Sequence, residues 1–443
     1  MSVGTETVVV EPVPRLVGHL EVPGDKSISH RAVLIGAICD GETQITGFGR
    51  SADTEATIAA VRACQVKVYE HGHDALRIYG VGLHGLQAPT APIDCRNAGT
   101  LVRLFAGILA GQTWQEFELT GDASLSSRPM GRIVEPLREM GAGIEAADGK
   151  LPLGIQGRPL HAITYRLPMA SAQVKSAILL AGLYADGETT VVEPQPTRDH
   201  TERMLEKAGA RIRRRESSVS IEAAERLQLG EIAIPGDVSS AAPFIVAATL
   251  VAGSELHIHG LNLNPRRTGL LEILERMGAS ITVYNRREIG GEPGGDLEIR
   301  SAELVATAVG AEEVPLAIDE LPLFALAAAC ARGTSTLRGA AELRAKESDR
   351  IEATVDALRG LGVRIRGTDD GFVVTGVPAR LRGGRVDSRG DHRIAMLGAV
   401  AGLASSEGVR IENADAVSVS FPGFFEMLAA LRVSAPPDGG WTP

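Results

Sequence analysis

The sequence is poor in aromatic residues and in cysteine, and both shortages narrow the kinds of protein it encodes. Phe, Trp and Tyr make up 4% of the 443 residues, whereas glycine occurs 51 times. A core with so few rings relies on Ala, Val, Leu and Ile, with backbones that approach closely. The four cysteines are scattered and form no CxxC pair or Cys/His cluster: Cys39, Cys64, Cys95 and Cys330. We therefore expect neither a disulfide framework nor a zinc site, and a reducing compartment fits.

Basic residues are outnumbered, and long apolar runs are missing. The chain has 45 Lys and Arg against 55 Asp and Glu, a formal net charge of −10. This balance argues against a general nucleic-acid or membrane-surface binder, whose footprint is basic. The opening segment MSVGTETVVVEPVPRL has no signal-peptide pattern, and apolar segments such as residues 241–252 are shorter than a membrane span. We expect a soluble cytoplasmic protein without nucleic-acid or membrane partners.

Several cofactor and hydrolase motifs are also missing. No GxxxxGK[ST] or GxGxxG opens a helix, and neither HExxH nor a plausible GxSxG elbow occurs. ATP, NAD, zinc and serine-hydrolase chemistry are poorly supported as a result. We expect no cofactor and no metal.

An internal period of roughly 70 residues organises the chain. Six segments, beginning at Pro23, Asp94, Leu167, Ile234, Ile318 and Ser388, open with a polar or turn-forming cluster and run into a helix that is apolar nearly all round. Such helices are buried inside a domain. A β-type run, an amphipathic helix with a Gly-Ala or Gly-Val stop, and a hairpin-like pair follow, so the predicted unit is β-α-β-α-β-β.

Six units predict an α/β protein with two domains of three units each. We expect residues 23–236 to form one domain, and residues 1–22 with 237–443 to form the other. The strand before Pro23 then completes the sheet of the second domain. Two chain crossings would make a hinge and allow a cleft to open and close. A continuous sheet across both halves would contradict this hypothesis.

The first repeat carries the clearest chemical signal. In PGDKSISHR, Lys26, Ser27 and Arg31 lie in the first turns of the predicted helix, where unpaired N–H groups and the helix dipole are already positive. Two cations there are unfavourable unless an anion binds, although a capped helix with solvated cations is an alternative. The later helix starts repeat the arrangement with polar and charged residues: Asn97, Gly99, Thr100, Arg103, Ser171, Gln173, Lys175, Asp237, Ser239, Asp319, Glu320, Asp391, His392 and Arg393. Six clusters at one repeat position predict a site for phosphates and carboxylates.

Three further segments add candidates. SSRPM places Arg128 in a turn before a helix, suited to fork-like binding of a carboxylate or phosphate. RAKESDR, residues 344–350, reads either as a solvated ion-pair face or as part of the site, and its place ahead of an amphipathic helix favours the site. In RDHTE, residues 198–202, a hydrogen-bonding structural role is the better interpretation of His200.

Taken together, these motifs resemble the 5-enolpyruvylshikimate-3-phosphate synthase family. PGDKSISHR, NAGT-x-x-R, SSRPM, SAQVK, RDHTE, KESDR and GDHR occur in that order over essentially the whole chain. The resemblance implies a two-domain inside-out α/β barrel with three repeats per domain and an active site in a closing cleft. It also implies transfer of the enolpyruvyl group of phosphoenolpyruvate to the 5-hydroxyl of shikimate 3-phosphate, with phosphate released through a tetrahedral intermediate, on the route to chorismate and the aromatic amino acids.

The resemblance also implies roles for individual residues. Shikimate 3-phosphate would be held by Lys26, Ser27, Arg31, Ser171, Gln173, Thr197, Asp319 and Lys346. Phosphoenolpyruvate would be held by Lys26, Gly99, Arg128, Gln173, Arg350 and Arg393. Asp319 would be the base toward the 5-hydroxyl, and Lys26 and Glu347 are candidates for protonating the methylene carbon. The two small-molecule substrates are the expected partners of a monomer.

The sequence lacks one cation that many members of the family have. Many members have Lys before the late Thr-Phe-Pro, where this chain has Val419. SAQVK and RDHTE resemble the divergent class II, some members of which tolerate the inhibitor glyphosate, yet NAGT keeps the Gly99 of sensitive enzymes. Asn264-Pro265-Arg266-Arg267 fits the class II pattern only in part, and inhibitor tolerance stays open.

Two alternatives belong to other classes. UDP-N-acetylglucosamine enolpyruvyl transferase shares the six-unit fold, but it has Lys-Asn where this chain has Lys26-Ser27, and often a loop cysteine that is missing here near Ser124–Met130. A DNA sliding clamp is also built from repeated α/β units, but its ring needs an inward basic surface, against a net charge of −10.

Overall fold

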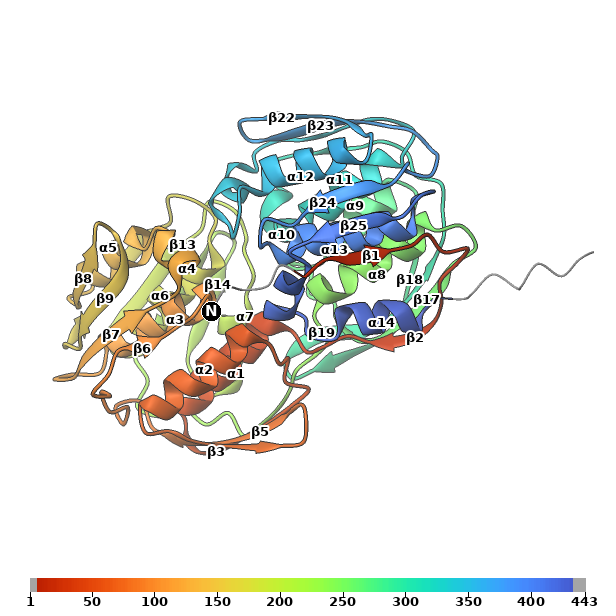
Figure 1. The fold of residues 1–443 in the computed structure, drawn as a ribbon. Coiled ribbons are helices and arrows are strands. Elements are labelled where there is room, and N and C mark those ends of the chain that lie inside the picture. The colour runs from red at the N-terminus through yellow and green to blue at the C-terminus, as the bar shows by residue number, and fades with distance from the viewer. Residues whose placement is uncertain (1–5, 433–443) are drawn as a thin grey trace, which may run out of the picture. The chain divides into compact units, whose positions relative to one another are not determined.

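A computed structural model describes residues 6–432; residues 1–5 and 433–443, which the expected second domain includes, lie outside the described part. The chain separates into two compact units. The N-terminal unit combines Pro23–Pro235 with the short segment Glu288–Glu292. The C-terminal unit combines the chain up to Val22 with Gly236–Arg287 and the chain from Pro293 onward. Figure 1 shows the order of the elements.

The N-terminal unit contains three four-stranded sheets. Their orders are β16-β3-β5-β4, β6-β7-β9-β8 and β11-β13-β15-β14. The strands of the first are β3 (Asp40–Thr46), β4 (Lys67–His71), β5 (Ala75–Val81) and β16 (Glu231–Ala233). Those of the second are β6 (Ile93–Asp94), β7 (Glu116–Thr120), β8 (Gly143–Ala147) and β9 (Lys150–Gln156). Those of the third are β11 (Thr164–Arg166), β13 (Glu188–Val192), β14 (Ile212–Arg215) and β15 (Ser218–Glu222), while β10 (Leu160–His161) pairs with β12 (Ala185–Asp186).

Two kinds of helix alternate with these strands. The buried helices are α1 (Lys26–Ala37), α3 (Gly99–Ala110) and α6 (Ala172–Gly182). The amphipathic helices are α2 (Ala52–Ala63), α5 (Gly131–Glu139) and α7 (His200–Lys207), and α4 (Ala123–Ser127) is a short extra helix before α5. The buried helices are surrounded by the core, as expected for helices that are apolar nearly all round.

The C-terminal unit repeats this plan. Its sheets have the orders β18-β19-β17-β2, β20-β21-β23-β22 and β1-β25-β24. The strands of the first are β2 (Val17–Glu21), β17 (Glu255–Asn262), β18 (Ser280–Ile289) and β19 (Glu292–Arg300). Those of the second are β20 (Ala308–Val309), β21 (Gly333–Leu337), β22 (Arg364–Thr368) and β23 (Gly371–Gly376). Those of the third are β1 (Val8–Val10), β24 (Gly384–Asp387) and β25 (Val409–Glu412).

Its helices again fall into two sets. The buried helices are α8 (Val238–Leu250), α11 (Leu321–Ala329) and α13 (His392–Leu403). The other helices are α9 (Gly269–Arg276), α10 (Val314–Ala317), α12 (Arg350–Gly360) and α14 (Phe424–Ala430), with 3₁₀ turns η1 (Ala341–Ala345) and η2 (Ala414–Val419). No helix of the described residues is long and apolar enough to cross a membrane.

One pairing pattern recurs in all six of these sheets. In each sheet, one strand has a parallel neighbour on one side and an antiparallel neighbour on the other. Strand β7 lies in this way between β6 and β9, and β21 lies between β20 and β23. The last sheet keeps the pattern with a strand from elsewhere in the chain, because β1 lies antiparallel to β25 (Figure 1). The predicted β-α-β-α-β-β unit and the α/β class are therefore confirmed.

The leading strands of two repeats are exchanged. Strand β2 runs into α1 but pairs with β17, whereas β16 runs into α8 but pairs with β3. The segment before Pro23 thus contributes its strands to the C-terminal unit. The sequence did not indicate that the β18–β19 hairpin tip, Glu288–Glu292, groups with the N-terminal unit.

The amphipathic helices end in the same way, as the Gly-Ala and Gly-Val stops predict. After α5, Gly141 takes φ +99°, and the next N–H, of Ala142, donates to the carbonyl of Leu137. This six-residue loop is the Schellman cap, whose left-handed residue favours glycine. Glycines with positive φ follow α7, α9 and α12 at the same point, namely Gly209, Gly278 and Gly362, whereas Gln65 takes this place after α2.

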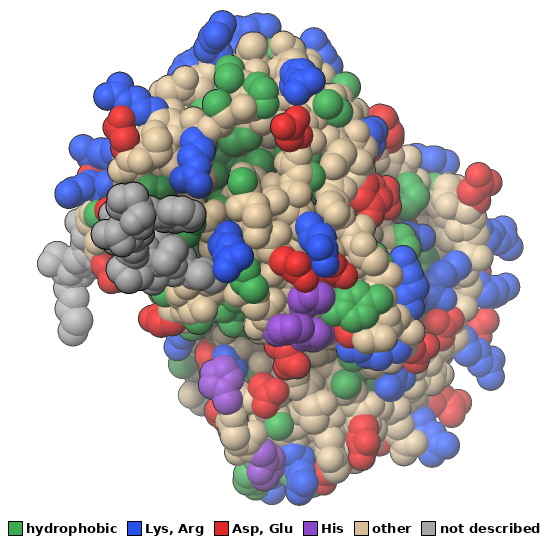
Figure 2. Space-filling view, turned by 90° about the vertical axis from the view of Figure 1, so that its right-hand side faces the viewer, with side chains coloured by type: hydrophobic (Ala, Val, Ile, Leu, Met, Phe, Trp, Pro, Cys, Tyr) green, Lys and Arg blue, Asp and Glu red, His purple; other side chains and the backbone are tan. Residues whose placement is uncertain are grey.

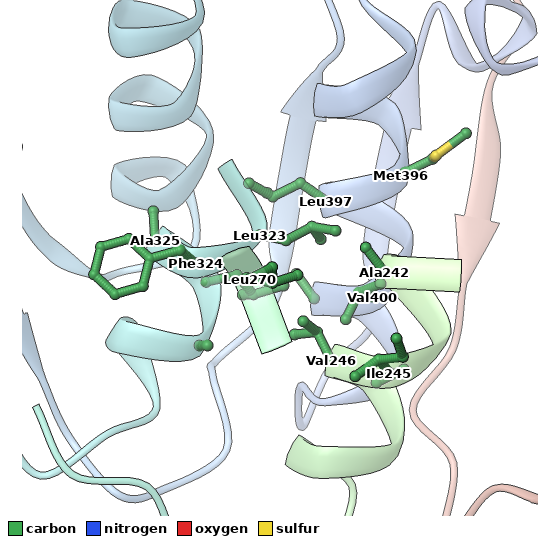
Figure 3. Packing of buried hydrophobic residues seen from close by; sticks show 14 of the residues in the cluster. Ala242, Ile245, Val246, Leu270, Leu323, Phe324, Ala325, Met396, Leu397 and Val400 are labelled. Atoms are coloured by element: carbon green, nitrogen blue, oxygen red, sulfur yellow. The ribbon is translucent and has the colours of Figure 1, made fainter. Parts of the chain in front are cut away.

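Each unit has its own hydrophobic core. In the C-terminal unit, α8, α11 and α13 contribute Ile245, Phe324 and Val400, all fully buried. Figure 3 shows these side chains and Leu270 of α9, which belong to one buried cluster. Close packing of aliphatic side chains replaces the missing aromatic rings, and it holds the three helix starts in a defined arrangement.

Candidate active site

The start of α1 presents Lys26 from a rigid cap. Asp25 precedes the helix and accepts a hydrogen bond from the N–H of Ile28 at 3.0 Å. The ammonium of Lys26 is partly exposed and lies 2.9 Å from a carboxylate oxygen of Asp53, in the first turn of α2. Asp53 offsets the repulsion between Lys26 and the positive end of the helix dipole. The cation is thereby oriented while remaining accessible to a ligand.

Arg31 is buried one turn further along α1. Its guanidinium donates to the hydroxyls of Thr201 at 2.7 Å and Ser176 at 3.0 Å, and to the carbonyl of Ser27 at 2.9 Å. Burial lowers the pKa of Arg31 to about 10, so the side chain keeps its charge at neutral pH. Arg31 therefore holds the backbone at Ser27 and supplies positive charge from behind it.

The starts of α3 and α6 are joined by side chains. Gln173 donates to the hydroxyl of Thr100 at 2.9 Å and accepts from Arg103 at 2.6 Å. Ser171 caps α6 by accepting from the N–H of Val174 at 3.4 Å. A Cβ built on Gly99 would lie 2.9 Å from a terminal nitrogen of Arg103, so the lack of a side chain leaves the start of α3 open.

Arg128 follows α4 and turns back to the start of α3. Its guanidinium donates to the side-chain oxygen of Asn97 at 2.6 Å and to the hydroxyl of Ser124 at 3.2 Å. A Cβ on Gly99 would come within 3.3 Å of it. The structure thus brings Gly99 and Arg128 together.

Thr197 is positioned by a buried ion cluster. Lys175 is fully buried and lies 3.0 Å from Glu193 and 2.7 Å from Glu202. Glu193 accepts from the N–H of Thr197 at 3.2 Å and also from its hydroxyl. Lys175, which the sequence placed among the helix-start groups, therefore acts from behind the loop that carries Thr197.

Arg350 is the centre of the corresponding network in the C-terminal unit. This arginine is 1% exposed, and its Nε lies 2.8 Å from Asp391, the cap of α13. Its terminal nitrogens lie 2.6 Å from Glu347 and 3.2 Å from Asp319. Burial opposes the charge, but the three carboxylates outweigh it and raise the pKa of Arg350 above its ordinary value. Among these residues, Asp319 and Glu347 remain partly exposed.

The charge run at residues 344–350 combines both interpretations made from the sequence. Arg344 is exposed and pairs with Asp349, the cap of α12. Lys346 lies 3.6 Å from Asp319 and is partly exposed. One end of the run is therefore a solvated ion pair, while the other brings cations to Asp319.

Arg393 joins the starts of α13 and α8. It donates to the carbonyl of Ser239 at 3.0 Å, and the hydroxyl of Ser239 donates to Glu320. Arg267 lies 3.0 Å from Asp237, the cap of α8. Val419, where the family often has a cation, lies at the end of η2.

The structure adds residues that the sequence analysis did not single out. Asp53 neutralises Lys26, and Glu193 and Glu202 neutralise Lys175. Each acid is between 18 and 27 residues from its cation in the sequence. Their contribution depends on tertiary contacts. Only Glu202 carried a signal, because it closes the RDHTE segment.

One group of side chains in the N-terminal unit has the composition of a metal site. Ligand atoms of Asp199, His200 and Glu292 lie within 4.8 Å of one another, and all three residues are buried. However, Arg203 lies 3.1 Å from Asp199 and 3.6 Å from Glu292, and His200 is hydrogen-bonded to Glu292 at 2.8 Å. A guanidinium already balances the carboxylates, so the group fits the structural role expected for His200 better than a metal ion.

The cysteines are unsuited to nucleophilic chemistry. All four are free, and burial raises the pKa of each thiol to about 12: Cys39, Cys64, Cys95 and Cys330. The reactive form of cysteine is the thiolate. These thiols therefore stay protonated at neutral pH.

Fold and site together define a six-repeat α/β protein that carries cations and carboxylate caps at its helix starts. The family model described as EPSP synthase (3-phosphoshikimate 1-carboxyvinyltransferase) matches residues 10–428. This chain belongs to that family. A 3-phosphoshikimate 1-carboxyvinyltransferase of Acidithiobacillus ferrooxidans is 52% identical over 416 residues, 94% of this chain and 95% of the relative. One of Pelobacter propionicus is 49% identical over 97% of this chain and all of the relative.

Solved structures give the same result for the fold. An EPSP synthase from Acinetobacter baumannii superposes with a TM-score of 0.87 at 44% identity, covering 97% of this chain and 98% of the other. The resemblance that the motifs carried is therefore confirmed over the full fold.

Proposed function

We propose that this chain transfers the enolpyruvyl group of phosphoenolpyruvate to the 5-hydroxyl of shikimate 3-phosphate, releasing phosphate. The observation that carries the proposal is the placement of the motif cations at helix starts, as at Lys26 and Arg393. Both substrates are polyanions, and their mutual repulsion must be offset before they can react. Fixed cations and helix dipoles supply that offset without reorganisation.

We assign each substrate to the residues expected from the family motifs. Lys26, Gly99, Arg128, Gln173, Arg350 and Arg393 hold phosphoenolpyruvate. Lys26, Ser27, Arg31, Ser171, Gln173, Thr197, Asp319 and Lys346 hold shikimate 3-phosphate. In the N-terminal unit, the hydrogen bonds around Gln173 and the short approach of Gly99 to Arg128 support this grouping.

The proton transfers fall to partly exposed groups. Asp319 receives the proton of the 5-hydroxyl, and Arg350 and Lys346 stabilise its negative charge. The 5-oxygen bonds to the phosphate-bearing carbon of phosphoenolpyruvate while Lys26 or Glu347 delivers a proton to the methylene carbon, giving the tetrahedral intermediate. Loss of a proton from the new methyl group, with departure of phosphate, then restores the double bond. This addition and elimination require only acid–base groups and positioning.

Three further features belong to the same proposal. The two units act as domains that close on the substrates, with a hinge at two of the points where the chain passes between them, near Val22 and near Gly236. The chain works as a monomer in the cytoplasm. Light scattering of the purified protein, with and without substrates, tests the monomer, and small-angle scattering tests closure.

The decisive experiment measures phosphate release from phosphoenolpyruvate, with and without shikimate 3-phosphate, for the wild type and Lys26→Met. Release that needs both substrates and is lost in K26M is expected. Lys67→Met is the matched control, because Lys67 is exposed on β4, outside the site. Release with UDP-N-acetylglucosamine alone as the acceptor would instead identify the sister transferase, and release that K26M retains would remove Lys26 from the mechanism.

A further inference from the structure

Three histidines share the outer face of a sheet in the C-terminal unit, on elements that carry none of the proposed substrate-binding residues. His19 lies on β2, while His257 and His259 lie on the neighbouring parallel strand β17. His19 is directly opposite His257 in the register. The alternate residues Leu256 and Ile258 are fully buried, so the histidines point away from the core.

The imidazole rings are in direct contact. Nδ1 of His19 lies 3.0 Å from Nε2 of His259, and the ring of His19 lies 4.6 Å from that of His257 and 5.2 Å from that of His259. A hydrogen bond between two imidazole nitrogens requires one of them to be an unprotonated acceptor. At least one nitrogen lone pair is therefore present within the cluster.

Carboxylates surround these rings. Glu255 lies 3.7 Å from Nε2 of His257, and Asp296 lies 3.7 Å from Nδ1 of His259. The hydroxyl of Tyr284 lies 3.2 Å from Nδ1 of His257. Figure 2, which faces the side where β2 and β17 lie in Figure 1, shows histidine side chains against acidic ones at the surface.

Asp296 is held in place beside His259. Its carboxylate accepts hydrogen bonds from the N–H of Gly260, from Asn285 and from Arg287, whose guanidinium balances its charge. A carboxylate beside a ring nitrogen orients the imidazole and makes its other nitrogen a better ligand. Asp296 stands in this relation to His259.

We propose that His19, His257 and His259 bind one divalent transition metal ion of the class that prefers imidazole, such as Zn²⁺ or Ni²⁺. Around such an ion, metal–nitrogen bonds of about 2.0–2.1 Å place neighbouring ligand nitrogens about 3 to 3.4 Å apart. The 3.0 Å between His19 and His259 is close to this spacing. On binding, the proton between His19 and His259 moves to the non-ligating nitrogen of its ring, and the rings turn so that their lone pairs meet at the ion.

The surroundings favour a cation over a simple hydrogen-bonded pair of histidines. A pair needs two rings, whereas this face supplies a third. Arg300 and Arg287 already balance the carboxylates of Glu255 and Asp296, so the three rings carry the proposal. Water completes the coordination at a surface site. The site lies outside the transfer machinery proposed above, so its ligands can be replaced without removing a substrate contact.

Isothermal titration calorimetry of the full chain, free of any added histidine tag, tests the proposal with ZnCl₂ and NiCl₂. We expect one ion per chain. His19→Gln and His259→Gln should each weaken binding more than about tenfold, since even indirect supports of a metal ligand contribute that much. His71→Gln is the matched control, because His71 is exposed on β4 outside the cluster.

Transferase turnover verifies that the variants are folded, and H19Q should retain it. The absence of binding to either ion by the wild type would overturn the proposal. So would full retention of binding in both H19Q and H259Q. If H71Q lost metal binding to the same extent, the ion would bind elsewhere, and the proposal would also be overturned.

Discussion

Arg350 holds Asp391 across two helix starts, with its Nε 2.8 Å from a carboxylate oxygen of Asp391. Asp391 in turn accepts from the N–H of Arg393 at 2.9 Å and from the hydroxyl of Ser348 at 2.9 Å. The pair therefore connects the cap of α13 to the segment that presents Glu347. Through it, the stability of the C-terminal unit depends on groups that we assign to substrate binding.

Breaking this buried pair should destabilise the protein strongly. Arg350→Met leaves Asp391 buried beside Glu347 without its main cation, and we expect a loss of about 3–5 kcal/mol in the free energy of unfolding. Urea denaturation measures it. Arg344→Met removes an exposed arginine of the same segment and should cost about 0–1 kcal/mol. A double variant R350M/D391N that loses the full sum of both single effects would show that the two side chains are not coupled.

Lys175 offers a second test, which joins stability to substrate affinity. Lys175→Met leaves Glu193 and Glu202 buried without their shared cation, so we expect a loss of about 3–5 kcal/mol in urea. Because Glu193 positions Thr197, the KM for shikimate 3-phosphate should rise more than that for phosphoenolpyruvate. The exposed-lysine variant K67M should change neither. Equal changes in both KM values would assign Lys175 a general structural role.

His30 should make stability depend on pH. Burial lowers its pKa to about 3, against the ordinary 6.5, so between these values the unfolded chain binds one more proton than the folded chain. Above about pH 6.5, the contribution of His30 to the free energy of unfolding is fully present. As the pH falls from 6.5 toward 3, this contribution is lost by about 1.4 kcal/mol per pH unit. Urea denaturation across pH 4 to 8 should show a shallower slope for His30→Gln than for H71Q. Identical slopes would contradict the assignment.

Gly107 marks a close approach of α3 to α6. A Cβ built there would lie 2.2 Å from the carbonyl oxygen of Ala177, an atom of rigid helical backbone. Gly107→Ala should destabilise by about 1–3 kcal/mol, although alanine ordinarily favours a helix over glycine. Gly131→Ala at the start of α5 meets no atom closer than 3.9 Å and should be neutral or stabilising. Thermal unfolding of the two variants measures the difference. Equal changes in Tm would show that the close approach at Gly107 does not limit stability.

Gly99 tests the proposed phosphoenolpyruvate contacts. Its added Cβ would meet the flexible ends of Arg103 and Arg128, which can move without disturbing the helix. Gly99→Ala should therefore fold normally but raise the KM for phosphoenolpyruvate by about tenfold, equivalent to about 1.4 kcal/mol, through displacement of Arg128. Steady-state kinetics with each substrate varied provides the measurement. A rise confined to the KM for shikimate 3-phosphate would move Gly99 to the other substrate.

The repeats could be predicted from the sequence because each depends on local chemistry. The cap at Asp25, the all-apolar helix after it and the glycine at Gly141 are signals that lie within one repeat. The helix-start clusters could be located for the same reason. Their motifs also carry the family resemblance, so the fold and the list of candidate residues came together.

The partners of these residues could not be predicted. Asp53 neutralises Lys26 from the next helix, and Glu193 is 18 residues from Lys175, with nothing in the intervening sequence to indicate either contact. The burial of Arg350 was equally hidden, since a run of alternating charges usually lies in solvent. Such ion pairs form only when several elements pack at once, and the sequence of one element does not contain them.

The pairing of β1 with β25 has a consequence for synthesis on the ribosome. Val8 lies opposite Ile411, so the first strand waits for a partner translated about 400 residues later. At about 5–20 residues per second, that interval is about 20 to 80 s. Apart from the hairpin tip at Glu288–Glu292, the N-terminal unit is one continuous segment that emerges whole during this time. The segment Val8–Val10 of the nascent chain therefore lacks its β25 partner throughout this interval, and the last sheet of the C-terminal unit can be completed only near the end of synthesis.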